Sequence, residues 1–158
     1  MRLPYSVLRF CLIVSSVLFI VGTSAKADAP PERLSALAEK YAQTHGIPSA
    51  LVHAVIAVES GWRRDARNGS SIGLMQITPS TARSLGYRGS TKDLFDPETN
   101  IKFGVQYLAI AYERAGGDLC GTVVRYQSGI DAQKINAANR AYCLRAKNFM
   151  ATYEGAIN

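Results

Sequence analysis

The chain reads Ala57-Val58-Glu59-Ser60-Gly61-Trp62 at the end of an apolar stretch, and Gly73-Leu74-Met75-Gln76-Ile77 follows shortly after. Steps of three and four residues place Leu51, Val52, Val55, Ile56 and Glu59 on one face of a helix. A carboxyl on such a face is costly to ionise, so we expect the pKa of Glu59 to rise. A raised pKa suits a general acid that works near neutral pH. The two stretches therefore predict a cleft where one carboxyl lies beside a loop that offers an amide and a thioether.

Helical patterns dominate on both sides of this centre. No segment alternates apolar and polar residues over a useful length, so strands should be few or absent. Ser49, Thr78 and Asp96 stand where helix N-caps are expected, and proline follows the last two of them. The predicted helices cover residues 32–44, 50–60, a short segment after 79, 97–114, 119–127 and 136–153. We therefore predict an all-α domain with little or no sheet.

Two single residues in these helices also carry predictions. His53 lies toward another face than Glu59, so we expect a partly exposed helix residue without a catalytic role. Gly104 lies beside the apolar stripe of its helix, which indicates a close contact with another helix. The segment 63–72 is rich in charge, glycine and serine, and is predicted to be a loop.

The N-terminus has the pattern of an export signal. Arg2 and Arg9 are followed by an apolar run over 10–21, and Ala25-Lys26-Ala27 offers a cleavage site. The run is short for a membrane span, so we expect no stable membrane anchor. The predicted organisation is a cleaved signal at 1–27, an N-terminal helix and linker at 28–48, and a catalytic domain with C-terminal helices at 49–158.

Charge and cysteine usage narrow the class of partner and cofactor. Removing residues 1–27 lowers the net charge from +6 to +3, and no block of basic residues remains, which argues against nucleic acid as a partner. No Cys-x-x-Cys occurs, and both histidines are distant from the cysteines in sequence, so neither a metal nor another cofactor is expected. In an exported chain, Cys120 and Cys143 favour a disulfide, the alternative being two reduced buried thiols.

Four motifs in order resemble the catalytic domain of the soluble lytic transglycosylases, a family with a lysozyme-like fold of the goose-type class. The resemblance covers roughly 49–128, and it rests on Glu59-Ser60-Gly61-Trp62, Gly73-Leu74-Met75-Gln76-Ile77, Asp96-Pro97-x-x-Asn100-Ile101-x-x-Gly104-x-x-Tyr107-Leu108 and Arg125-Tyr126-Gln127-Ser128-Gly129. The third motif is interpreted mainly as scaffold.

The resemblance implies roles for particular residues. Glu59 matches the single catalytic acid and base of the family, and Met75 and Gln76 match loop residues that line its sugar cleft. Tyr126 matches the tyrosine whose hydroxyl lies near the acid. Gln127 stands where the family usually has asparagine, so its hydrogen bonds are expected to differ. Ser71 is taken as the substrate-contacting serine, although the spacing leaves Ser70 open as an alternative.

The implied reaction cuts the β-1,4 bond between MurNAc and GlcNAc in peptidoglycan and forms 1,6-anhydro-MurNAc ends. Two other functions remain open at this point. A hydrolytic muramidase would need a second carboxylate, for which Asp65 is the best candidate. A non-catalytic protein that binds or assembles the cell wall would keep the cleft without the chemistry.

The expected location is the periplasm of a Gram-negative type envelope, where the glycan strands of peptidoglycan are the partner. Compact members of the family often serve envelope-spanning machines. By analogy, we expect components of a secretion, conjugation or flagellar apparatus to be further partners.

Overall fold

The computed structural model describes residues 30–157, so the predicted signal at 1–27 lies outside the described residues. The described chain is mainly helical with one antiparallel pair of short strands, as expected for an all-α domain with little sheet. The elements are α1 (Glu32–His45), α2 (Ser49–Ser60), β1 (Arg67–Asn68), β2 (Ser71–Ile72), α3 (Pro79–Ser84), the 3-10 helix η1 (Lys92–Phe95), α4 (Pro97–Arg114), α5 (Leu119–Ser128) and α6 (Ala137–Ile157). Within this range, no helix is both long enough and apolar enough to cross a bilayer.

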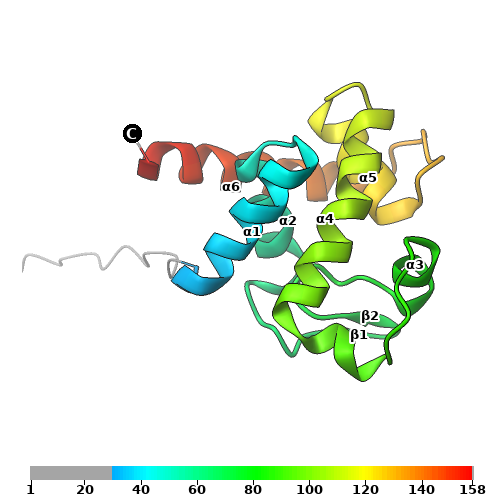
Figure 1. Cartoon of the computed structure of the whole chain (residues 1–158). Coiled ribbons are helices and arrows are strands. Elements are labelled where there is room, and N and C mark those ends of the chain that lie inside the picture. Colours follow the sequence, from blue (N-terminus) through cyan, green and yellow to red (C-terminus); the bar gives the residue numbers. More distant parts are fainter. Residues whose placement is uncertain (1–29, 158) are drawn as a thin grey trace, which may run out of the picture.

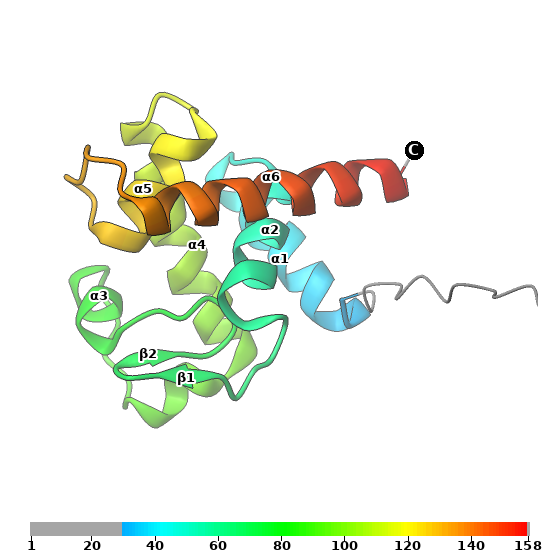
Figure 2. The same cartoon turned by 180° about the vertical axis from the view of Figure 1, so that it is seen from behind.

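Helix α4 runs through the middle of the molecule (Figure 1). The hairpin and α3 lie near its N-terminal half, while α5 follows its C-terminal end. The view from behind shows α6 lying across α2 and beside α5 (Figure 2). This arrangement brings the C-terminal helix, which is distant in sequence, against the helix that carries Glu59.

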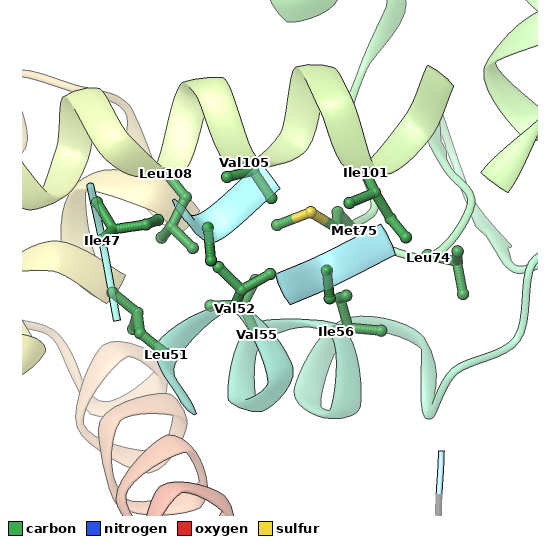
Figure 3. Packing of buried hydrophobic residues seen from close by; sticks show 12 residues of the cluster. Ile47, Leu51, Val52, Val55, Ile56, Leu74, Met75, Ile101, Val105 and Leu108 are labelled. Atoms are coloured by element: carbon green, nitrogen blue, oxygen red, sulfur yellow. The ribbon is translucent and has the colours of Figure 1, made fainter. Parts of the chain in front are cut away.

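The main core lies between α1, α2 and α4. Val52 and Val55 of α2 face Val105 and Leu108 of α4, and all four side chains are fully buried (Figure 3). Burying an aliphatic side chain of this size contributes about 1.5–3 kcal/mol, so this contact fixes α2 firmly against α4. The last turn of α2, and Glu59 with it, is therefore held by a rigid support.

The face of α2 that carries His53 is also buried, so the prediction of a partly exposed histidine was wrong. Only 4% of His53 is exposed, and its ring centroid lies 4.3 Å from that of Tyr153 in α6. Trp62 contacts the same imidazole edge-on, with 5.1 Å between ring centroids. Helix α2 is apolar on nearly all sides, since residues of α1 and α4 share the core cluster with one face and α6 covers another.

Two of the three predicted N-caps are confirmed. The Thr78 side chain accepts a hydrogen bond from the Thr81 N–H at the start of α3, and Asp96 does the same for Thr99 at the start of α4. The prediction for Ser49 was wrong, because this residue is the first of α2 and makes no capping bond. Pro48, which has extended backbone angles, holds the cap position instead.

The segment 63–72 contains a hairpin where a loop was predicted. Arg67 pairs with Ile72 and Asn68 with Ser71, so Gly69 and Ser70 form a two-residue turn. Gly69 has a φ of 58°, a conformation that glycine adopts at little cost and that tight hairpin turns require. The strands are too short to show a period of two in the sequence.

Helices α5 and α6 are joined covalently, which confirms the predicted disulfide between Cys120 and Cys143. Val123 of α5 packs with Tyr142 and Ala146 of α6 in a second buried cluster beside the bridge. The disulfide therefore fastens α6 close to the residue through which this helix approaches Glu59.

Candidate active site

A cavity of about 420 Å³ opens beside the C-terminal end of α2. It lies where α2, the hairpin, the start of α3, the middle of α4 and the C-terminal end of α5 approach one another. The lining residues are Glu59, Asn68, Ser71, Gln76, Ile77, Thr78, Thr81, Tyr107, Tyr126, Gln127 and Gly129. Apart from Glu59 the lining is neutral and rich in hydroxyl and amide groups, which suits a neutral polyhydroxylated ligand.

Glu59 is the acidic residue of this cavity. It lies in the last turn of α2 and is only partly exposed. Burial raises the pKa of its carboxyl from 4.5 to about 7, whereas a hydrogen bond from Tyr142 and the charge of Arg145 oppose the increase. The raised pKa predicted from the sequence is confirmed. At neutral pH this group is populated both as an acid and as a base.

Tyr142 is a residue that the sequence analysis missed. Its hydroxyl donates a hydrogen bond of 2.9 Å to Glu59 Oε1, from a side chain that is only 2% exposed. Tyr142 lies on α6, 83 positions from Glu59, and belongs to none of the four motifs. A donor at this distance stabilises the carboxylate form and fixes one carboxyl oxygen in place.

Tyr126 lines the cavity as predicted, but its hydroxyl is hydrogen-bonded to the loop that carries Met75. It donates a hydrogen bond of 2.7 Å to the Met75 carbonyl, and its ring lies 5.5 Å from that of Tyr107. Burial and, next, the charge of Glu59 raise the pKa of Tyr126, so the phenol stays protonated in this environment. Tyr126 thus forms a wall of the cavity close to the carboxyl.

The loop at 73–76 is folded back so that it returns to the cavity. Backbone bonds of 3.1 Å in both directions between Ile72 and Ile77 close it. Gln76 has a φ of 47°, an uncommon conformation for a residue other than glycine. Its Nε2 donates to the carbonyls of Ala66 and Gly73 at 3.2 and 2.9 Å, which holds the side chain at the rim.

Two side chains outside the cavity hold this loop in position. Ser60 donates a hydrogen bond of 2.8 Å to the Leu74 carbonyl, joining the end of α2 to the loop. Asn100, fully buried on α4, donates to the carbonyls of Ile72 and Leu94 and accepts from the Met75 N–H, at 2.8 Å in each case. The interpretation of Asn100 as scaffold therefore agrees with its contacts.

Met75 was predicted to contact substrate, and the structure does not bring its side chain into this cavity. The side chain is fully buried and points into the core between α2 and α4 (Figure 3). A β-carbon added to Gly104 would lie 2.5 Å from the Met75 sulfur. The close approach predicted at Gly104 is thus made by this side chain rather than by another helix.

The remaining predicted residues lie at the cavity. Ser71 lines it, whereas Ser70 is in the hairpin turn and is not among the lining residues. Gln127 lines it from the end of α5, and its Oε1 accepts a hydrogen bond of 2.6 Å from Asn139 Nδ2. Asn139 belongs to α6 and was not predicted.

The cavity contains one carboxylate among its described lining residues. Asp65, the candidate second carboxylate of a hydrolase, is exposed on the loop after α2 and does not line the cavity. Asp96 is used as the cap of α4. No group of three or more side chains of the metal-ligating types is gathered within residues 30–157.

Comparisons with known proteins agree with this geometry. The family model described as transglycosylase SLT domain matches residues 36–149. The endo-type membrane-bound lytic murein transglycosylase A of Klebsiella pneumoniae is 33% identical over 174 aligned positions, which cover 95% of this chain and 80% of that relative.

Solved structures show the same fold. The 70 kDa soluble lytic transglycosylase of Escherichia coli aligns over 78% of this chain with a TM-score of 0.68 and 26% identity. An inactive mutant of the lytic transglycosylase Slt of Pseudomonas aeruginosa aligns over 78% of the chain with a TM-score of 0.69 and 24% identity. This chain spans 24% of the length of each of those two solved chains.

Proposed function

This chain belongs to the transglycosylase SLT domain family, and we propose from that premise that it is a peptidoglycan lytic transglycosylase with Glu59 as its acid and base. One observation carries the proposal: a single carboxyl whose pKa is raised to about 7 lies in a cavity lined otherwise by neutral and mostly polar residues. The relative from Klebsiella pneumoniae, which aligns over nearly the whole chain, is named for the same activity.

The proposed reaction uses Glu59 twice. Protonated Glu59 first gives its proton to the bridging oxygen of a β-1,4 bond between MurNAc and GlcNAc, and the bond to C1 breaks. The acetamido group of the muramoyl unit assists at C1 in place of a protein nucleophile. Ionised Glu59 then takes the proton of the C6 hydroxyl, whose oxygen bonds to C1 and closes a 1,6-anhydro ring. Glu59 ends protonated, as it began.

The pKa of Glu59 fits both halves of this cycle. A carboxyl with a pKa near 4.5 would be almost fully ionised at pH 7 and would rarely hold a proton to donate, whereas one near 7 serves as donor and as acceptor. We assign Tyr142 the role of holding the carboxyl oxygen and stabilising the carboxylate between the two steps. Because this assignment rests on one hydrogen bond of 2.9 Å, it is open to direct test.

We assign the sugar contacts to Ser71, Gln76, Tyr126 and Gln127, all of which line the cavity. For Met75 we propose a different role from the one expected. Its side chain packs against Gly104, and its carbonyl receives the Tyr126 hydroxyl, so Met75 shapes the wall without touching the sugar.

We further propose that the protein acts in the periplasm on glycan strands and serves an envelope-spanning machine of the secretion, conjugation or flagellar type. The predicted export signal supports this proposal. Deletion of the gene should impair the assembly of one such machine, and a deletion strain with every envelope machine intact would contradict it.

The decisive test of the function is a digest of purified peptidoglycan with residues 28–158, followed by mass spectrometry of the products. Lytic transglycosylation yields muropeptides lighter by one water than the products of hydrolysis, because C6 oxygen replaces water at C1. Products with ordinary reducing ends would identify a muramidase and direct attention to Asp65. A folded protein that binds the glycan without cleaving it would favour the non-catalytic function.

The pH profile of cleavage gives a second test. We expect kcat/KM to fall about tenfold for each pH unit above 7, because only protonated Glu59 can begin the reaction and the free enzyme sets this limb. The Tyr142 hydrogen bond lowers the pKa of Glu59, so Tyr142→Phe should move this limb to higher pH. A limb that stays in place in Tyr142→Phe would show that the hydroxyl does not act on Glu59.

A further inference from the structure

The carboxamide of Gln127 is held by a chain of hydrogen bonds that begins at a backbone group. The N–H of Asn136 donates to Asn139 Oδ1 at 3.1 Å, and Asn136 Oδ1 in turn accepts from the Asn139 N–H at 2.8 Å. This reciprocal pair has the form of a capping box at the start of α6. Asn139 then donates from Nδ2 to Gln127 Oε1 at 2.6 Å and to Ser128 Oγ at 3.0 Å.

The direction of this chain is fixed by chemistry. A backbone N–H can only donate, so the atom of Asn139 that receives it must be the carbonyl oxygen. The other end of the Asn139 amide is therefore the NH₂ group, which can only donate, and Gln127 must meet it with its own oxygen. The Gln127 NH₂ group is then left without a hydrogen bond within residues 30–157 and is the end that Gln127 can offer to the cavity.

The side-chain amide of Gln76 is oriented oppositely to that of Gln127. Its NH₂ group donates to two backbone carbonyls, of Ala66 and Gly73, which can only accept. Its Oε1 is left as the end without a partner among the described residues. The cavity beside Glu59 thus has one glutamine that offers an acceptor and another that offers a donor.

We propose that Asn139 is a positioning residue that sets the polarity of Gln127, so that Gln127 donates to, and Gln76 accepts from, an acetamido group of the glycan. This inference rests on the proposed function and adds the chemical group that the cleft selects. A secondary amide presents one C=O and one N–H, which this pair matches, whereas a sugar with a 2-hydroxyl lacks the carbonyl.

The substitution Asn139→Asp tests the polarity directly. The new carboxylate would still accept from the Asn136 N–H, but its second oxygen would face Gln127 and require the NH₂ group of that residue. Gln127 would turn its oxygen to the cavity, and Ser128 could donate its hydroxyl to the carboxylate. The fold should persist, because an acidic residue is favourable in the first turn of a helix.

The matched control is Asn136→Asp, which adds the same charge one turn earlier and keeps the oxygen that accepts from the Asn139 N–H. A second variant, Gln127→Glu, removes the donor at the cavity while keeping an oxygen for Asn139. Binding is measured by titration calorimetry with chitotetraose, which has acetamido groups, and with cellotetraose, which has 2-hydroxyls on the same β-1,4 backbone. The ratio of the two affinities is the readout.

We expect the wild type and Asn136→Asp to bind chitotetraose at least about tenfold more tightly than cellotetraose, the effect of one or two hydrogen bonds. Asn139→Asp and Gln127→Glu should each lower the ratio of the two affinities about tenfold, while the affinity for cellotetraose changes little. An equal loss for both sugars would show a merely structural role and overturn the proposal, as would an unchanged ratio or a wild type that binds neither sugar.

Failure of the proposed function would look different from failure of this inference. A wild type that prefers chitotetraose but releases no anhydro product from peptidoglycan would contradict the catalytic proposal alone. A wild type that makes anhydro products, together with an Asn139→Asp variant of unchanged preference, would contradict the role of Asn139 alone.

Discussion

The substitution Glu59→Gln should reduce cleavage of peptidoglycan by at least about a thousandfold, because it removes the group that both gives and takes the proton. Glutamine has nearly the same size and can still receive the Tyr142 hydroxyl on its carbonyl oxygen. The cavity should therefore keep its shape and bind glycan. The loss should appear in kcat, with KM changed little.

The same variant should be more stable than the wild type above pH 7. Burial raises the pKa of Glu59 from 4.5 to about 7, so the folded state holds a proton that the unfolded chain releases above pH 4.5. The stability due to this proton is complete below pH 4.5 and is lost as the pH rises through 7. The amide that replaces the carboxyl is neutral throughout, so we expect a gain of roughly 1–3 kcal/mol at pH 8 and a smaller gain at pH 5.

Both effects are measured on one pair of proteins, by the rate of muropeptide release and by urea unfolding at pH 5 and pH 8. Glu113→Gln serves as the control, because Glu113 is an exposed carboxylate on α4 that does not line the cavity. It should change neither rate nor the pH dependence of stability. Residual cleavage by Glu59→Gln within tenfold of the wild type would rule out Glu59 as the acid.

The sequence predicted Glu59 because local patterns are enough to do so. Apolar residues at steps of three and four place the carboxyl on a buried face, and burial alone explains most of its raised pKa. The caps at Thr78 and Asp96 were predictable for the same reason, since each interaction spans only three residues. The disulfide followed from the number of cysteines in a chain that was predicted to be exported.

Tyr142 and Asn139 could not be predicted in this way. Both lie on α6 and act on residues of α2 and α5, and their roles arise only because α6 crosses α2 (Figure 2). A tyrosine in a helical stripe is more often packing than a partner of an acid. The burial of His53 has the same origin, since the helix that covers it comes from the far end of the chain.

Met75 shows a different limit. The motif correctly indicated that the loop returns to Glu59, but not which of its side chains would point toward the cavity. The fold of residues 73–76 sends Gln76 to the rim at a φ of 47° and Met75 into the core. A motif conveys the position of a residue in the chain, whereas its direction depends on tertiary contacts such as the buried Asn100.

Asn100 is the residue whose loss should cost the most stability. It is completely buried and uses both ends of its amide, with two donated bonds and one accepted bond of 2.8 Å each. Asn100→Leu keeps the volume but takes the amide partner away from the Leu94 carbonyl and the Met75 N–H, and leaves the Ile72 carbonyl with the Ile77 N–H alone. We expect the free energy of unfolding to fall by about 3–5 kcal/mol, since each such group costs about 1–3 kcal/mol.

Asn100→Asp separates the electrostatic part of this loss from the packing part. Its carboxylate could still accept from the Met75 N–H, but the other oxygen would face the carbonyls of Ile72 and Leu94, which only a protonated acid can approach favourably. Its pKa should therefore be raised in the folded state, and stability should fall as the pH rises from 5 to 8. Asn148→Asp, an exposed substitution on α6, should cost less than about 0.5 kcal/mol at either pH.

Urea unfolding of these variants at pH 5 and pH 8 measures how much the hydrogen bonds of Asn100 to the loop at 73–76 contribute to stability. The Asn100 amide holds Ile72 and Met75, which flank the turn that presents Gln76. We therefore expect both Asn100 variants to bind glycan more weakly than the wild type, even under conditions in which they are folded. A pH-independent loss in Asn100→Asp would show that the two carbonyls move away from the new carboxylate. The loop would then be held mainly by the backbone pairing of Ile72 with Ile77. Asn100 would in that case contribute to stability through packing rather than through its hydrogen bonds.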